Sequence, residues 1–262
     1  MSAMSLSPRR LDDALRESAH SGAVDDLSVI LAQGADPVSI CAALSAAAYN
    51  GHLECVKLLI PFYDSKADSS QALRHAAYSG HAECVKLLIP LSDPAADESY
   101  ALRWAARKGR SECVKLLIPF CGRTARVAAL LSAAETGCFE CVSLLASSVS
   151  NPRDLCRALV NAARSGHAEC VSLLLQSAKP SALKASHIFL NAAEAGQAQV
   201  AAAMLAYDPL LLSSESFPEI LKSALAQGHL DLAALLSSAI DQRELALATG
   251  ASKRPPLKAA RL

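Results

Sequence analysis

Residues 71–88 read QALRHAAYSGHAECVKLL, and this order of small, aliphatic and glycine residues recurs along most of the chain. Leu73, Ala76 and Ala77 fall on one face of a helix, because an α-helix completes a turn about every 3.6 residues. Gly80 is expected to end that helix in the left-handed conformation that other residues avoid. The stretch therefore predicts a first helix that stops at the glycine.

A second helix is expected directly after the glycine. Cys84, Val85, Leu87 and Leu88 form a broad apolar stripe at helical spacing. Pro90 cannot continue a helix, so the second helix should stop just before it. Each copy of the pattern is thus predicted to be a pair of helices that buries its apolar faces against neighbouring pairs.

Eight glycines occupy the same place in the pattern, at intervals of mostly 29 residues and within a range of 28 to 32. A period of this size is typical of solenoids, in which small units stack and cover one another's apolar faces. The expected fold is therefore all-α, a solenoid of about eight stacked helix pairs. The glycines are Gly22, Gly51, Gly80, Gly109, Gly137, Gly166, Gly196 and Gly228.

The pattern also predicts the boundaries along the chain. We expect a disordered segment at residues 1–10, the solenoid at residues 11–240 and a basic tail at residues 241–262. Units 11–37 and 218–240 depart from the pattern in the way that terminal caps do. The tail is interpreted as a solvated end, and a nucleic-acid contact or a nuclear address is the alternative.

Composition excludes several classes of partner. The chain has 262 residues, with 25 Lys plus Arg and 25 Asp plus Glu, so its formal net charge is +0. This balance gives no general attraction to nucleic acid or to an anionic membrane. No apolar run reaches the roughly 18 residues of a membrane span. Arg9 and Arg10 have no apolar core behind them, unlike a cleaved signal peptide. We expect a cytoplasmic protein, and leave open export without a cleaved signal peptide.

Cysteines recur with the pattern as well. Five of the nine lie four residues after a repeat glycine. Equivalent residues of stacked helices should be about 10 Å apart, whereas a disulfide needs Cα atoms within about 7 Å. We therefore expect a column of free, buried thiols, which indicates a reducing compartment. The five are Cys55, Cys84, Cys113, Cys141 and Cys170.

One C-x-x-C motif is present, at Cys138 and Cys141. Cys141 belongs to the thiol column, and Cys138 occupies the position that holds histidine in four other repeats. No second C-x-x-C is available to complete four zinc ligands. We therefore expect no metal site and no redox centre there.

The repeat now resembles a known family. Ala76-Ala77-x-x-Gly80-His81-x-Glu83-x-Val85-Lys86-Leu87-Leu88 is similar to the two-helix part of the ankyrin repeat, and Gly34-Ala35-Asp36-Pro37 is similar to that family's turn between repeats. The resemblance covers about residues 11–240. It implies the ankyrin fold and a role in binding other proteins.

Two departures from the family pattern bear on the surface. The period is mostly 29 residues, against about 33 in the family. The missing residues fall between one pair and the next, where the family places a β-hairpin finger, so we expect short or absent fingers. The family's Thr-Pro-Leu-His box is also absent, with Arg74 and Arg103 standing where its histidine would be.

Variable positions of the first helices carry the candidate binding residues. His75 and Trp104 lie five residues before a repeat glycine, and Tyr49, Tyr78 and Arg107 lie two residues before one. Tyrosine, tryptophan and arginine are enriched at interface hot spots. The alternative is that Trp104 packs on neighbouring stems and the arginines are only solvated. The predicted partner-binding residues are Tyr49, Arg74, His75, Tyr78, Arg103, Trp104 and Arg107.

No motif for chemistry accompanies them. The sequence has no glycine-rich phosphate loop, no Gly-x-Ser-x-Gly and no His-Glu-x-x-His. The histidines that follow the repeat glycines are expected to hydrogen-bond local backbone. We therefore expect no catalytic residues, no metal, no cofactor and no enzymatic activity.

The resemblance implies a non-catalytic scaffold that binds a partner protein through the helical surface of its repeats. One alternative is a regulatory inhibitor or neutralising subunit that blocks a specific enzyme. Another is a bacterial or viral effector that acts on a host protein, and a third is a carrier with no fixed partner. We expect one or more protein partners, no small-molecule substrate, no nucleic acid, no membrane and a monomeric state.

Overall fold

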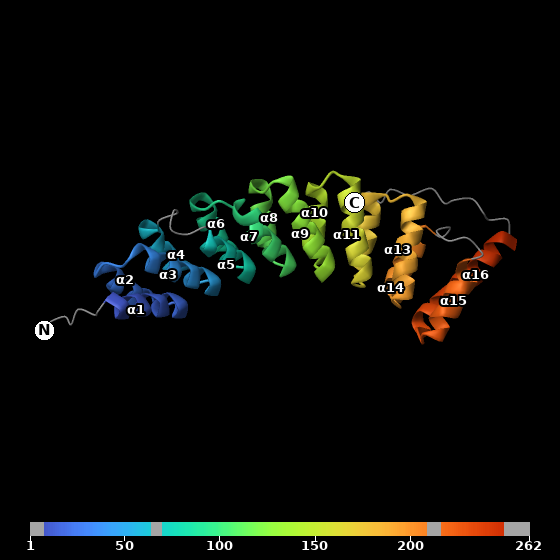
Figure 1. The fold of residues 1–262 in the computed structure, drawn as a ribbon, viewed down its shortest axis with the longest axis horizontal. Helices are drawn as coiled ribbons and strands as arrows, with labels where there is room; N and C mark the ends of the chain where they lie inside the picture. Colours follow the sequence, from blue (N-terminus) through green and yellow to red (C-terminus); the bar gives the residue numbers. More distant parts are fainter. Residues whose placement is uncertain (1–7, 64–69, 209–215, 249–262) are drawn as a thin grey trace. The chain divides into compact units, whose positions relative to one another are not determined.

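The computed structural model describes residues 8–63, 70–208 and 216–248. Its chain divides into two compact units, Met1–Lys179 and Pro180–Leu262. Within the described residues the regular structure is entirely helical, with six pairs of α-helices in the first unit and two pairs in the second (Figure 1). The predicted all-α architecture of about eight helix pairs is confirmed.

The helices alternate along the chain as first and second members of each pair. In the first unit, the first helices are α1 (Pro8–Ser21), α3 (Pro37–Asn50), α5 (Gln71–Ser79), α7 (Ala96–Arg107), α9 (Arg123–Thr136) and α11 (Pro152–Arg164). The second helices are α2 (Val24–Ala32), α4 (Leu53–Leu59), α6 (Ala82–Leu88), α8 (Ser111–Leu117), α10 (Phe139–Ser148) and α12 (Ala168–Ala178). The second unit contains α13 (Ala182–Glu194), α14 (Ala198–Tyr207), α15 (Ser216–Ala226) and α16 (Leu230–Ala248).

Within each unit, every helix contacts its counterpart in the next pair. In the first unit, α1, α3, α5, α7, α9 and α11 contact one another in that order, and the second helices do the same. The result is two layers with the core between them. In the second unit, α13 contacts α15 and α14 contacts α16.

Small side chains let these layers approach closely. Leu73, Ala76 and Ala77 of α5 are fully buried, as are Val85 and Leu88 of α6. The predicted apolar faces are therefore confirmed for these positions, although Leu87 is only half-buried. Three second helices continue into a 3₁₀ turn that contains the proline, because proline fixes φ but cannot donate a backbone hydrogen bond. These turns are η1 (Ile60–Phe62), η2 (Ile89–Leu91) and η3 (Ile118–Phe120).

The repeat glycine ends its helix in the left-handed conformation, as predicted; Gly22, for example, has a φ of 79°. It also lies against the next pair: a Cβ at Gly22 would come within 2.7 Å of His52 Nδ1. The same imidazole donates from Nε2 to the carbonyl oxygen of His20, at 3.0 Å. The repeat glycine therefore ends the first helix and also leaves the space into which a side chain of the next pair packs.

The structure corrects one expectation about the histidines. His52, His81 and His167 each donate to a carbonyl oxygen 32 residues earlier, in the preceding pair, rather than to local backbone. Arg110, which follows Gly109, takes the same role: it lies against Gly80 of the preceding pair and donates to the carbonyl of Tyr78 at 3.4 Å. The side chain after the glycine thus links its helix pair to the preceding pair through a hydrogen bond. The sequence alone could not show this, because the acceptor is remote along the chain.

A serine in an unusual conformation holds one of the short connections between pairs. Ser70 has a φ of 61° and is buried. Its hydroxyl donates to the carbonyl of Asp93 at 3.2 Å and accepts from the N–H of Asp93 at 3.0 Å. Left-handed backbone costs a non-glycine residue roughly 1 kcal/mol or more, and the two hydrogen bonds offset that cost. Ser99, one repeat later, is buried with a φ of 57°.

Two predicted boundaries were wrong. Helix α1 begins at Pro8 rather than after residue 10, because proline is favoured in the first turn of a helix. Helix α16 continues to Ala248 instead of ending near residue 240, since residues 241–248 contain neither glycine nor proline and are mostly good helix formers. The rest of the predicted N-terminal segment (1–7) and tail (249–262) lies outside the described residues.

All nine cysteines are free, and the five of the predicted column are buried. Burial raises the pKa of Cys113 and of Cys170 to about 11 each. The pKa of Cys141 is also raised, first by burial and then by a hydrogen bond with Cys138. The column thiols therefore pack as small apolar side chains. No helix in the described part of the chain is both long and apolar enough to cross a bilayer.

We expect Gly22→Ala to lower stability more than Gly34→Ala. Both glycines have positive φ, so each alanine should cost about 1–2 kcal/mol of backbone strain. Only at Gly22 would the new methyl meet the His52 ring, whereas Gly34 has open space. The added loss at Gly22 should be at least about 1 kcal/mol, from the displaced hydrogen bond. Urea unfolding followed by circular dichroism measures the difference, and equal losses would contradict the close approach.

The thiols should differ sharply in reactivity. At pH 8 we expect Cys138 and Cys156, which are only half-buried, to be alkylated by iodoacetamide well before the column. Burial and a raised pKa leave the column thiols with little thiolate, and the thiolate is the reacting form. Mass spectrometry of peptides taken over time measures the rates, with fully denatured protein as the control. Labelling of Cys113 as fast as Cys138 would show that the column is open.

Candidate partner-binding surface

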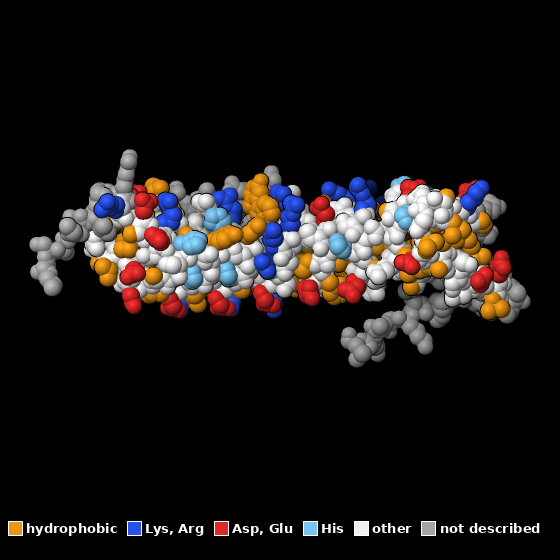
Figure 2. Space-filling view, turned by 90° about the horizontal axis from the view of Figure 1, so that it is seen from below, with side chains coloured by type: hydrophobic (Ala, Val, Ile, Leu, Met, Phe, Trp, Pro, Cys, Tyr) orange, Lys and Arg blue, Asp and Glu red, His pale blue; other side chains and the backbone are white. Residues whose placement is uncertain are grey.

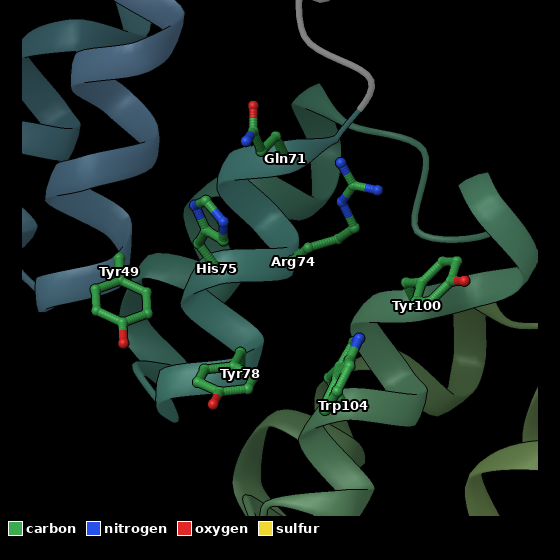
Figure 3. Close-up of a pocket in the computed structure, with 7 residues that line it drawn as sticks. All are labelled: Tyr49, Gln71, Arg74, His75, Tyr78, Tyr100 and Trp104. Carbon is green, nitrogen blue, oxygen red and sulfur yellow. The ribbon is translucent and has the colours of Figure 1, made fainter.

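A hollow of about 470 Å³ opens between α3, α5 and α7 in the first unit. Figure 3 shows Tyr49 from α3, four side chains from α5 and two from α7 around it, with Arg74 extending from α5 toward α7. We call it the aromatic hollow. It is lined by Tyr49, Gln71, Arg74, His75, Tyr78, Tyr100 and Trp104.

The rings of this hollow touch in sequence across three pairs. Tyr49 and Tyr78 are stacked, with centroids 6.2 Å apart and planes at 19°. Tyr78 meets the edge of Trp104 at 5.6 Å, and His75 meets the edge of Tyr49 at 5.8 Å. Such pairs are each worth about 0.5–1.5 kcal/mol beyond the area that they bury. The rings form a preordered surface that nonetheless stays open, because Tyr49 is 46% exposed and Trp104 is half-buried.

Cations lie over three of the rings. Arg107 lies 5.4 Å from the Trp104 centroid, Lys108 lies 4.8 Å from that of Tyr78, and Arg103 lies 5.1 Å from that of Tyr100. A cation over an aromatic face contributes about 0.5–1 kcal/mol at an exposed site. The cluster therefore combines aromatic area with positive charge.

The backbone that carries this cluster is held by hydrogen bonds from the helix pairs that come next in the sequence. The carbonyl of Tyr49 accepts from His81, and the carbonyl of Tyr78 accepts from Arg110. These are the hydrogen bonds described above that link neighbouring helix pairs. The variable side chains are thereby presented from a rigid frame, which lowers the entropy lost on binding.

The structure brings together most of the predicted residues. Tyr49, Arg74, His75, Tyr78 and Trp104 line the aromatic hollow. Arg107 lies beside it over Trp104, whereas Arg103 lines a second hollow of about 310 Å³ that is bordered by α7 and the start of α9.

Sequence reasoning missed Gln71, Tyr100 and Lys108. Gln71 and Tyr100 each lie nine residues before a repeat glycine, and helical spacing links each to a predicted residue: Tyr100 is four residues before Trp104. Lys108 is four residues after Trp104. Extending the candidate positions by one helical turn in each direction would have found all three.

A third hollow, of about 390 Å³, lies between α9 and α11. Asp154 accepts from Arg123 at 2.9 Å and has Arg157 at 3.7 Å. The Asp154 side chain is only 14% exposed, whereas the two arginine side chains are 64% and 63% exposed. We call this the arginine hollow. It is lined by Arg123, Thr124, Val127, Ala128, Leu131, Asp154 and Arg157.

The remaining candidate chemistry has a structural context. Cys138 donates from Sγ to Glu140 Oε2 at 3.8 Å, and Cys138 and Cys141 are both free thiols. Among the described residues, no group of three or more His, Cys, Asp or Glu side chains could hold a metal ion.

The helix pairs and the glycine stops define a helical-repeat protein. The family model for ankyrin repeats, which spans three copies, matches residues 15–98 and 102–184, together more than half of the chain. The chain therefore belongs to the ankyrin repeat family, as its resemblance implied. Repeats of this family are generally protein–protein interaction scaffolds.

Comparison with solved structures supports the same assignment. The chain is similar to the human ASB11 ankyrin repeat domain, with 25% identity and a TM-score of 0.54. The match covers 62% of this chain and 82% of that domain. A comparison with curated proteins finds no match.

Proposed function

We propose that the chain is a non-catalytic scaffold that binds one or more partner proteins through the aromatic hollow. The observation that carries the proposal is the run of contacting rings across three helix pairs, part-exposed and flanked by Arg107 and Lys108. Tryptophan, tyrosine and arginine dominate the energy of protein interfaces when they are clustered and preordered.

Packing of the repeat gives no reason for these side chains. In α7 the residues that fill the core are Leu102, Ala105 and Ala106, all fully buried. Trp104 lies on another face of the same helix and remains half-buried. A large aromatic side chain at a position that the core does not use is consistent with selection for binding.

The proposed setting follows from the same chemistry. Free thiols persist in reducing compartments, so we infer a cytoplasmic location for a protein with nine free cysteines. We infer that its ligands are proteins rather than small molecules, since the aromatic hollow is open and spans three pairs. We further propose that the chain is a monomer.

Trp104→Ala tests the proposal. We expect binding of the partner to weaken by more than about 1 kcal/mol, which is about fivefold in affinity, while the midpoint of thermal unfolding falls little. Affinity capture from a lysate of the source cells identifies the partner, and titration calorimetry with the purified partner measures the loss.

Phe120→Ala is the matched control, because Phe120 is an aromatic residue that is 52% exposed on η3, outside the aromatic hollow. It should leave the captured proteins unchanged. Equal capture by wild type and Trp104→Ala, together with a large loss of thermal stability in that variant, would show that Trp104 belongs to the core instead.

A further inference from the structure

A net charge of zero conceals a separation of charge between the two helix layers. Helices α5, α7, α9 and α11 carry eight arginines against four carboxylates, whereas α6, α8, α10 and α12 carry four glutamates against two lysines. Figure 2 shows acidic side chains along one edge of the first unit and basic side chains gathered toward the opposite edge. The layer that holds the aromatic hollow is therefore the basic one.

The three hollows of this layer form one track. Arg103 contacts the ring of Tyr100, which lines the aromatic hollow, and itself lines the second hollow. The second hollow and the arginine hollow share Thr124 and Ala128. The track thus runs from α3 to α11 without leaving the first-helix layer.

The arginine hollow carries an excess of positive charge. Two guanidinium groups share the single carboxylate of Asp154, so one positive charge is in excess. Asp154 also holds both groups in place, and arginine offers five N–H donors in a fixed fork. A carboxylate of a ligand can therefore bind there without first ordering the arginines.

We propose that the partner presents an extended acidic polypeptide segment, which lies across α5 to α11 with an apolar or aromatic anchor in the aromatic hollow and a carboxylate at Arg123 and Arg157. The proposal rests on the proposed function and adds the chemistry of the ligand. Neighbouring packed helices are about 10 Å apart, so the part of the track from α5 to α11 measures roughly 30 Å. At about 3.3 Å per residue, an extended segment of roughly nine residues covers it.

A nucleic acid fits the track less well. Bases bind proteins by stacking on open aromatic faces, but Tyr49 and Tyr78 stack on each other, and Arg107 and Lys108 lie over Trp104 and Tyr78. An acidic peptide, by contrast, needs only the arginines for its carboxylates.

The test selects random 12-residue displayed peptides on the purified full-length chain. We expect the enriched pool to be richer in Asp and Glu than the starting pool. A synthetic peptide of the most enriched sequence should bind the variant Arg123→Gln/Arg157→Gln at least about fivefold more weakly, because its carboxylate loses a paired cation. The control Lys86→Gln/Lys115→Gln makes the same charge change on the second helices and should alter affinity less than about twofold.

A second variant guards against misfolding. Replacing both arginines removes the ion-pair partners of the poorly exposed Asp154, which can lower the stability of the fold. Thermal unfolding is therefore measured for each variant. Arg103→Gln, in the second hollow, is tested in parallel. Arg103→Gln should weaken the peptide in the same direction.

Each other outcome overturns the proposal. Enriched peptides that are neutral or basic, or an absence of enrichment, would refute an acidic ligand, and the scaffold role would survive if partner capture still depends on Trp104. Peptides whose affinity is unchanged by replacement of Trp104 and of the arginines would refute the proposed site itself. Tighter binding of a 20-residue uridine RNA, lost in Arg123→Gln/Arg157→Gln, would assign the track to nucleic acid.

Discussion

The structure depends on a contact that six of the repeat glycines make with the residue that follows the glycine of the next pair. Left-handed backbone ends the first helix, and the missing side chain makes room for an imidazole such as that of His52. That imidazole in turn binds a carbonyl at the end of the preceding first helix. One small residue therefore sets the helix length, the turn and the approach of the neighbouring pair.

This contact between pairs divides the positions of the repeat into those whose side chain is constrained by packing and those that can vary. Alanine, cysteine, valine and leucine fill the space between the layers, where a larger side chain would force the pairs apart. The outward positions of the first helices carry no such constraint. Tyrosine, tryptophan and arginine gather there, at three consecutive pairs, and the rigid frame beneath them makes a surface that needs little reordering to bind.

Shortening of the repeat has a structural counterpart. Within the described residues no β-strand is present, and Ser70 holds one connection between pairs through both hydrogen bonds of its hydroxyl to Asp93. The recognition surface that we propose is accordingly the first-helix layer itself. Charge is also divided between the layers, so a chain that is neutral as a whole presents a basic face.

Periodicity determined the fold: the glycine spacing, the alanine pair and the Cys-Val-Leu stripe predicted the helix pairs, their order and the buried thiols, because these features are local or repeat at a fixed interval. The same sequence placed Tyr49, Tyr78 and Trp104 on one surface. Only the tertiary structure showed that the histidines fasten neighbouring pairs, that Arg103 lines a different hollow from Trp104, and that Asp154 joins Arg123 to Arg157. The histidine bonds and the Arg123–Asp154 pair join residues 31 or 32 positions apart, and the place of Arg103 depends on the direction in which a long side chain turns. Neither is encoded in a local pattern.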